Sequence, residues 1–290
     1  METNYDGLFE DSKDYQKEGP QMLDKEAWAA KQKAQREALY TQADGMADKV
    51  LGDPEYLRAY LEAQARLGRA TITNTLLLMA QRPGASRVHT FEEWQRMGRS
   101  IKSGEQASLI FQKGREYVRE DGTIGAFQNV RRVFDIRQTT GKAVKQPPIH
   151  PVKHRLKALM AETAVPCKLS DNVSQSIGAS FNSETCVAEV ARGLDEDALF
   201  FCVARELARA EHGGSTFECD CAANILCNRY GMAPRYPDAI PEEYVNLDSE
   251  GKREALFKVR KAACAVMERM DRNLARLAQA YEKRQDGPQR

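Results

Sequence analysis

The sequence is poor in aromatic residues, in histidine and in long apolar runs, and its first half has no cysteine. No apolar stretch approaches the ~18 residues that a membrane-spanning helix needs, so we expect no membrane partner. The first residues are polar and acidic, without a cationic start and an apolar core, so we expect no secretory signal peptide. These absences favour a cytoplasmic protein.

All seven cysteines lie in the second half of the chain. Their odd number and their places in apolar helical patterns favour buried, reduced thiols in the cytosol. A zinc site of Cys219, Cys221 and Cys227 with His212 is an alternative. However, C-x-C-x₅-C is no standard zinc pattern, and positions 219 and 221 point to different faces of a helix. We therefore expect no metal and no cofactor.

The charge is nearly balanced over the whole chain, at +1, but a central segment is strongly basic. Residues 66–145 contain 15 Lys or Arg and 7 Asp or Glu, which gives this segment a net charge of +8. A basic block within a neutral chain favours a polyanionic partner.

Periodicity and turn signals predict an α+β fold with two folded domains. We expect a disordered tail over residues 1–20, a first domain over 21–137, a linker over 138–151 and a second domain over 152–290. The linker boundary rests on the composition QTTGKAVKQPPIHP, which is typical of a connecting segment.

The first domain is predicted to place helices before a β-hairpin. The helices are expected over 22–50, 55–67, 71–81 and 91–97, and the strands over 107–119 and 124–136. Asp121-Gly122 between the strands is a strong hairpin signal. The imperfect alternation at Arg131 and Arg132 suggests a bulge there.

The second domain is predicted to be mainly helical with a small sheet. A helix is expected over 153–162, a strand near Cys167 and a hairpin with its turn at Asn182-Ser183. The tail, 251–284, carries apolar residues at steps of three and four, which make one helical stripe. We expect this stripe to pack on its own domain, and a homodimer through a coiled coil is the alternative.

Residues 198–232 have the outline of a zinc-peptidase helix pair with the metal ligands replaced. Peptidases of the H-E-x-x-H type place two His on one helix face, supply a Glu beside the first, and draw a third ligand from a following helix. Here the five residues run from Arg205 through Glu206 to Arg209. An Arg keeps its proton in a protein, so it has no lone pair for zinc.

The second helix of this pair carries Glu218 and Asp220. Zincin-type families commonly take their third ligand from a Glu that opens this helix; Glu218 stands at that place, with Asp220 as the runner-up. We expect the arginines and carboxylates to form a salt-bridged, vestigial site without catalysis. The residues of this vestigial site are Arg205, Glu206, Arg209, Glu218 and Asp220. A weak metal held by His212 and the carboxylates is the alternative.

Four short motifs follow in order along the first domain: N-x-L-L-x-x-x-Q at 74–81, F-x-x-W at 91–94, G-R-x-x-K-x-G-E at 98–105 and NVRRVFDI at 129–136. Across residues 55–137 this order resembles the N-terminal domain of ArdC-type antirestriction proteins, which plasmids and other mobile elements carry. The resemblance implies a single-stranded-DNA-binding domain, a zincin-like metallopeptidase domain and the cytoplasm of a bacterial host. Because neither ligand His is present, we do not expect peptidase activity.

Binding of single-stranded DNA requires cations that follow the phosphates and flat side chains on which bases stack. The candidates are Arg69, Asn74, Arg82, Arg99, Lys102, Lys113, Arg115, Tyr117, Phe127, Arg131 and Arg132. Asn74 also fits a buried, turn-fixing amide, and Trp94 fits the core better than a stacking surface.

The sequence therefore predicts a non-enzymatic, DNA-binding antirestriction protein of a mobile element. One alternative is an inhibitor that holds a host defence nuclease, of a restriction or CRISPR type, in the former peptidase groove. A second alternative is an active metallopeptidase with unusual ligands.

Overall fold

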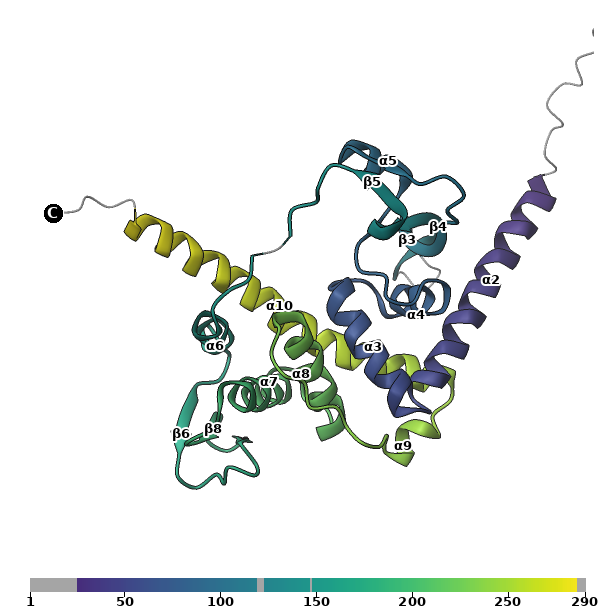
Figure 1. Cartoon of the computed structure of the whole chain (residues 1–290). Helices are drawn as coiled ribbons and strands as arrows, with labels where there is room; N and C mark the ends of the chain where they lie inside the picture. Colours follow the sequence, from purple (N-terminus) through teal and green to yellow (C-terminus); the bar gives the residue numbers. More distant parts are fainter. Residues whose placement is uncertain (1–24, 119–122, 147, 286–290) are drawn as a thin grey trace, which may run out of the picture. The chain divides into compact units, whose positions relative to one another are not determined.

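The computed structural model describes residues 25–118, 123–146 and 148–285 (Figure 1). The chain divides into two compact units after Thr41. In the described part of the first unit, helix α2 (Lys25–Val50) begins, and Lys33 Nζ lies 3.9 Å from Glu37 Oε1. In the second unit, helices accompany small sheets, which confirms the predicted α+β class. Within the described ranges, no helix combines the length and apolar composition needed to cross a bilayer.

Helices α3 (Pro54–Leu67) and α4 (Ile72–Gln81) are joined by a buried amide, that of Gln64. Its Nε2 donates to the carbonyl of Gly68 at 2.8 Å, and its Oε1 accepts from Thr75 Oγ1 at 2.9 Å. A buried polar group must be satisfied internally, so this pairing fixes the angle at which the two helices meet.

The main sheet of the first half is antiparallel, in the spatial order β1 (Val88–His89), β4 (Ile124–Asp135), β3 (Ser108–Val118). The register shifts between Lys113 and Glu116, so the bulge lies in β3. The bulge expected at Arg131 and Arg132 is wrong, because both residues pair in regular register with β3. Their break in alternation reflects exposed side chains on both faces of the strand, not an extra residue.

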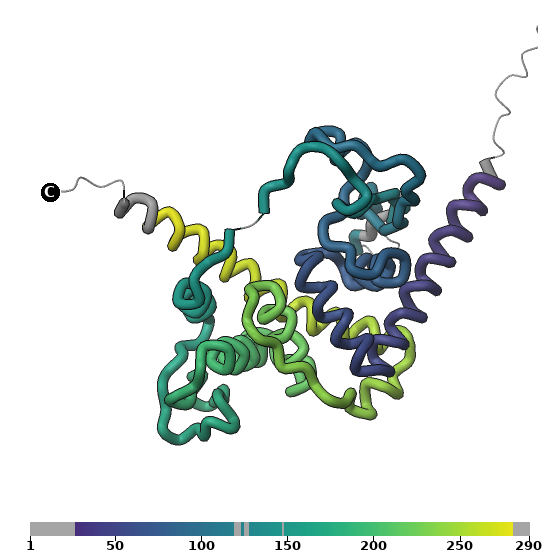
Figure 2. The backbone as a smooth tube through the Cα atoms, viewed as in Figure 1, coloured from purple at the N-terminus to yellow at the C-terminus, as the bar shows by residue number. Residues whose placement is uncertain are grey.

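Short elements complete this half: α5 (Phe91–Arg96), β2 (Arg99–Ile101), the 3₁₀ turn η2 (Ile136–Gln138) and β5 (Thr139–Gly141). Strand β5 pairs antiparallel with β2. The first part of the expected linker, 138–151, is thus hydrogen-bonded to the first half. Figure 2 shows the path of the backbone through these short elements. The domain boundary stays a prediction.

The second half contains α6 (Val152–Met160), β6 (Cys167–Ser170), β7 (Ala179–Asn182), β8 (Val187–Ala191), α7 (Glu196–His212), α8 (Thr216–Tyr230), α9 (Glu242–Val245) and α10 (Ser249–Gln285). The sheet order is β6-β8-β7, with β6 parallel and β7 antiparallel to β8. The predicted turn after Asn182 is confirmed: its Oδ1 accepts from the backbone of Glu184 and Thr185 at 2.9 and 3.1 Å.

The apolar stripe of α10 is buried within the second unit. Leu256, Val259, Ala263, Val266 and Met270 are all at most 3% exposed. The helix packs against α8, α6, α7 and α4, so the stripe is covered by its own chain (Figure 1). A coiled-coil dimer through the same residues would have to uncover them.

Candidate functional site

The helix pair α7–α8 carries the cluster that the sequence predicted, with Arg205 near its centre. Its Nε lies 2.7 Å from Glu206 Oε1, and its Nη2 donates to the carbonyls of Ala179 at 2.8 Å and Ile177 at 3.1 Å. Between these two carbonyls, Gly178 has a φ of 78°, and a Cβ there would come within 2.3 Å of Cys202 Sγ. Only glycine allows this approach of the chain to α7.

Glu206 is 2% exposed, and both of its carboxylate oxygens are engaged. Oε1 pairs with Arg205, while Oε2 accepts from the backbone N–H of Phe181 at 2.9 Å. Oε2 also lies 3.7 Å from Nε of Arg209, whose Nη2 donates to Thr216 Oγ1 at 3.1 Å. The carboxylate therefore fastens strand β7 to helix α7.

Asp220, the second choice for the third ligand position, faces this cluster, whereas Glu218, the first choice, does not. Oδ1 of Asp220 lies 4.0 Å from Arg205 Nε and has no hydrogen-bond partner. Burial raises the pKa of Asp220, although the two arginines act in the opposite direction. Glu218 instead closes a capping box: its Oε2 accepts from the N–H of Ser215 at 3.1 Å, and its own N–H donates to Ser215 Oγ. The S-x-x-E pattern at 215–218 signals this role in the sequence.

The residues of this cluster do not fit a metal ion. Arg205 and Arg209 have no lone pair to donate, both oxygens of Glu206 are taken, and one unpartnered oxygen of Asp220 remains. His212 lies elsewhere, at a cavity of about 300 Å³ beside Gly213 and the side chain of Lys258, and burial lowers its pKa. In the described part of the chain, no group of three or more His, Cys, Asp or Glu is placed to hold a metal.

Asn74 pairs with the backbone of β3. Its Nδ2 donates to the carbonyl of Phe111 at 2.8 Å, and its Oδ1 accepts from the N–H of the same residue at 2.9 Å. Seven residues later in the chain, Gln81 makes the same pair of hydrogen bonds with the backbone of Leu109, at 3.0 and 2.7 Å. The two amides of α4 thus substitute for a strand along the outer edge of β3, and the side-chain amide of Asn74 is directed at that edge.

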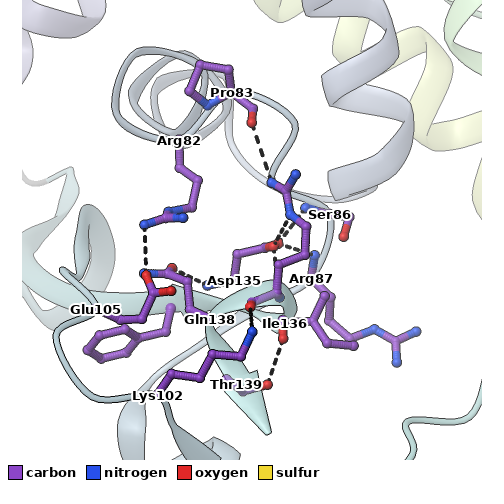
Figure 3. A network of polar contacts seen from close by, with 12 residues as sticks. Arg82, Pro83, Ser86, Arg87, Lys102, Glu105, Asp135, Ile136, Gln138 and Thr139 are labelled. Carbon is purple, nitrogen blue, oxygen red and sulfur yellow. Dashed lines mark hydrogen bonds and ion pairs between the residues drawn. The ribbon is translucent and has the colours of Figure 1, made fainter.

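Three of the predicted DNA contacts also have partners within the chain, and their role toward DNA stays a prediction. Arg82 Nη2 lies 3.3 Å from Glu105 Oε2, and Lys102 donates to a backbone carbonyl of η2 at 2.8 Å (Figure 3). Arg99 donates to the hydroxyl and carbonyl of Thr139, at 2.7 and 3.0 Å. These interactions hold the β2–β5 pair against the sheet.

Of the two other residues considered for DNA binding, one lies at the surface and one in the core. Arg69 is exposed, and its Nε lies 3.7 Å from Glu268 Oε1 on α10. Trp94 is fully buried, and its Nε1 donates to the carbonyl of Phe134 at 2.8 Å, which confirms the expected core position.

Five of the remaining candidates lie exposed on the β3–β4 hairpin. We call this set the basic ribbon: Lys113, Arg115, Tyr117, Arg131 and Arg132. Lys113 pairs with Glu116, and Arg131 donates to Gln112 Oε1 at 2.7 Å. Because consecutive strand residues alternate, Arg131 and Arg132 present charge on opposite faces. The side chain of Phe127 lies outside the described part of the structure.

Asp135 organises a polar network that the sequence analysis missed (Figure 3). It is 1% exposed and accepts from the N–H groups of Ser86 and Arg87, at 2.8 and 3.3 Å, and from Arg137 Nε at 2.7 Å. Burial alone would raise the pKa of Asp135, but these donors hold it below its ordinary value. The D-x-x-Q pattern at 135–138, a capping box, is the available signal: Gln138 Oε1 accepts from the N–H of Asp135.

Comparison with known proteins shows a similarity of fold. The sequence matches no protein-family model and no curated protein. The structure is similar to that of the antirestriction protein ArdC from plasmid R388. The Mn(II)-bound form gives a TM-score of 0.51 at 15% identity, over 76% of this chain and 98% of that one. The metal-free form gives 0.47 at 14%, over 70% and 85%. The resemblance seen in the sequence is thus confirmed for the fold.

Proposed function

We propose that this chain is a non-catalytic, nucleic-acid-binding antirestriction protein of a mobile element, and that its basic first half binds single-stranded DNA. The observation that carries the non-catalytic part is the burial of Glu206 together with the pairing of both its oxygens. A general base must have a free oxygen directed at a water or substrate. Here one oxygen pairs with Arg205 and the other with the N–H of Phe181, so the carboxylate supports structure.

The basic ribbon supports the nucleic-acid part of the proposal. Its four cations are exposed at a narrow two-stranded hairpin, with Tyr117 41% exposed near the far end. Proteins that bind single strands commonly combine cations that contact the phosphate backbone with an aromatic side chain on which a base stacks. Among the eleven candidate contacts, the proposal places most weight on the five of the ribbon.

The antirestriction part rests on the similarity of fold to ArdC from plasmid R388. That protein has been crystallised with Mn(II). The guanidinium groups of Arg205 and Arg209 are unsuited to the same ion, so we do not extend metal-dependent chemistry to this chain.

The test is binding of labelled oligothymidylate to the full chain, measured by fluorescence anisotropy over a salt series. We expect Arg131→Gln/Arg132→Gln to reduce the slope of log K against log[salt] by about 1.4, since each phosphate contact with a single strand contributes about 0.7. The matched control is Lys153→Gln/Lys157→Gln, which removes two exposed charges from α6. Salt-independent binding, or equal effects of the two pairs, would refute the proposal.

A further inference from the structure

A cavity of about 540 Å³ lies away from the basic ribbon and is lined by four cationic side chains. They are Arg66, Arg87, Lys145 and Arg229, and no Asp or Glu is among the described residues that line it. They come from the end of α3, the segment before β1, the segment after β5 and the last turn of α8. The volume falls in the range of ordinary ligand sites.

The charges in this cavity are oriented but largely not neutralised. Arg87 Nη1 donates to the carbonyl of Lys145 at 3.3 Å, and Arg229 Nη1 lies 3.5 Å from the carbonyl of Ala65. Neutral carbonyls direct a guanidinium without cancelling its charge. The nearest carboxylate that pairs with a lining residue is that of Glu62, 4.0 Å from Arg66.

Glu62 is itself shared with other groups. Its Oε1 accepts from Arg58 Nε at 3.1 Å and from the hydroxyl of Tyr236 at the same distance. Glu62 carries one negative charge and pairs more closely with Arg58 than with Arg66, so it offsets only part of the charge of Arg66. The cavity therefore retains most of its positive potential, which a bound anion would neutralise.

One wall of the cavity is fixed before any ligand arrives. The N–H groups of Ser86 and Arg87 donate to the buried Asp135, and the carbonyl of Arg87 accepts from the N–H of Ile136 at 2.9 Å (Figure 3). The guanidinium of Arg87 points away from this network in the same view. A cation on a rigid backbone loses less freedom on binding than one on a loose loop.

A second cavity adjoins this one at Arg229. It has a volume of about 720 Å³, shares Pro148 and Arg229 with the first, and is also lined by His150, Arg155 and one carboxylate, that of Asp271. The four cations of the first cavity come from separate segments of the chain and are spaced around it, which matches a ligand with several phosphates in a row. A rigid duplex carries its phosphates on a wide cylinder, whereas a single strand can bend into the hollow between these cations.

We propose that this cationic cavity holds the phosphate backbone of a single-stranded nucleic acid, through the side chains of Arg66, Arg87, Lys145 and Arg229. This inference rests on the proposed function and deepens it, because it adds the second half of the chain, through Arg229, to the binding surface. A strand that occupies the cavity contacts both halves of the molecule.

The experiment uses the full chain and labelled oligothymidylate over a salt series. Arg87→Gln/Arg229→Gln is expected to lower the slope of log K against log[salt] by about 1.4, for two lost phosphate contacts. Arg87→Lys/Arg229→Lys keeps both charges and is expected to retain the wild-type slope. The control, Lys153→Gln/Lys157→Gln, removes two charges that line neither cavity. Thermal melts of each variant identify any loss of folding.

The outcomes separate the inference from the proposed function. If the Gln pair behaves like the control pair while the basic-ribbon variant loses affinity, the cavity inference is overturned and the proposed function stands. If the Lys pair loses as much slope as the Gln pair, or a duplex competes as well as a single strand, the inference is also overturned. If the wild-type chain does not bind the oligonucleotide at all, the proposed function itself fails.

Discussion

Replacing Glu206 with Gln tests whether this carboxylate holds the structure together or serves a reaction. The change keeps the shape of the side chain but removes the charge that pairs with Arg205 and Arg209. Removing one partner of a buried ion pair costs about 3–5 kcal/mol. The two arginine side chains remain 17% and 35% exposed, so solvent screens part of this loss. We therefore expect a loss near the lower end, about 3 kcal/mol.

The measurement is urea unfolding, supported by a thermal melt. For a unit of this size each kcal/mol shifts the melting temperature by about 2–4 °C, so the expected fall is about 6–12 °C. The control is Glu250→Gln, an exposed carboxylate at the start of α10, which is expected to stay within about 0.5 kcal/mol of the wild type. Unchanged or increased stability of Glu206→Gln would refute the structural role.

Three further predictions concern buried polar groups. Asn74→Ala removes both hydrogen bonds that this side chain makes to the backbone of a buried β3 residue, so urea unfolding should show a loss of about 2 kcal/mol while the folded protein binds oligothymidylate unchanged. Burial raises the pKa of Asp220, so the folded state binds its proton more tightly than the unfolded state, and stability falls as pH rises from the ordinary carboxylate range through the raised value. Asp220→Asn should abolish that fall in unfolding experiments at several pH values; an unchanged pH profile would count against it. Burial also raises the pKa of the Cys219 thiol, so iodoacetamide should modify the exposed Cys186 in the native protein and Cys219 only in urea, as read by mass spectrometry.

Much of the fold is readable from local signals. Helix caps and turn residues place the main elements: Asp53 accepts from the N–H of Glu55, and Thr90 closes a capping box with Glu93. The stripe on the last helix predicts its buried face because its steps match the helical period. The arginines at 205 and 209 could be assigned to one helix face for the same reason. Glu206 lies between them in the sequence and is close enough to pair with both.

The sequence gives less guidance where long-range pairing decides the role of a side chain. Asn74 is favoured as a structural amide by the sequence, but its partner is identified only when β3 is placed beside α4. Glu218 and Asp220 are two residues apart, and only the rotation of α8 about its axis decides which faces Arg205. Arg229 joins the cationic cavity although it lies far along the chain from the other three cations.

Metal analysis of the purified protein, after incubation with Mn(II) and with Zn(II) and removal of the unbound ions, tests the central claim most directly. If guanidinium groups occupy the positions where a peptidase would hold its ion, the protein should retain far less than one equivalent of either metal. The Glu206→Gln variant should give the same trace. One equivalent per chain in the wild type, lost in that variant, would contradict the account.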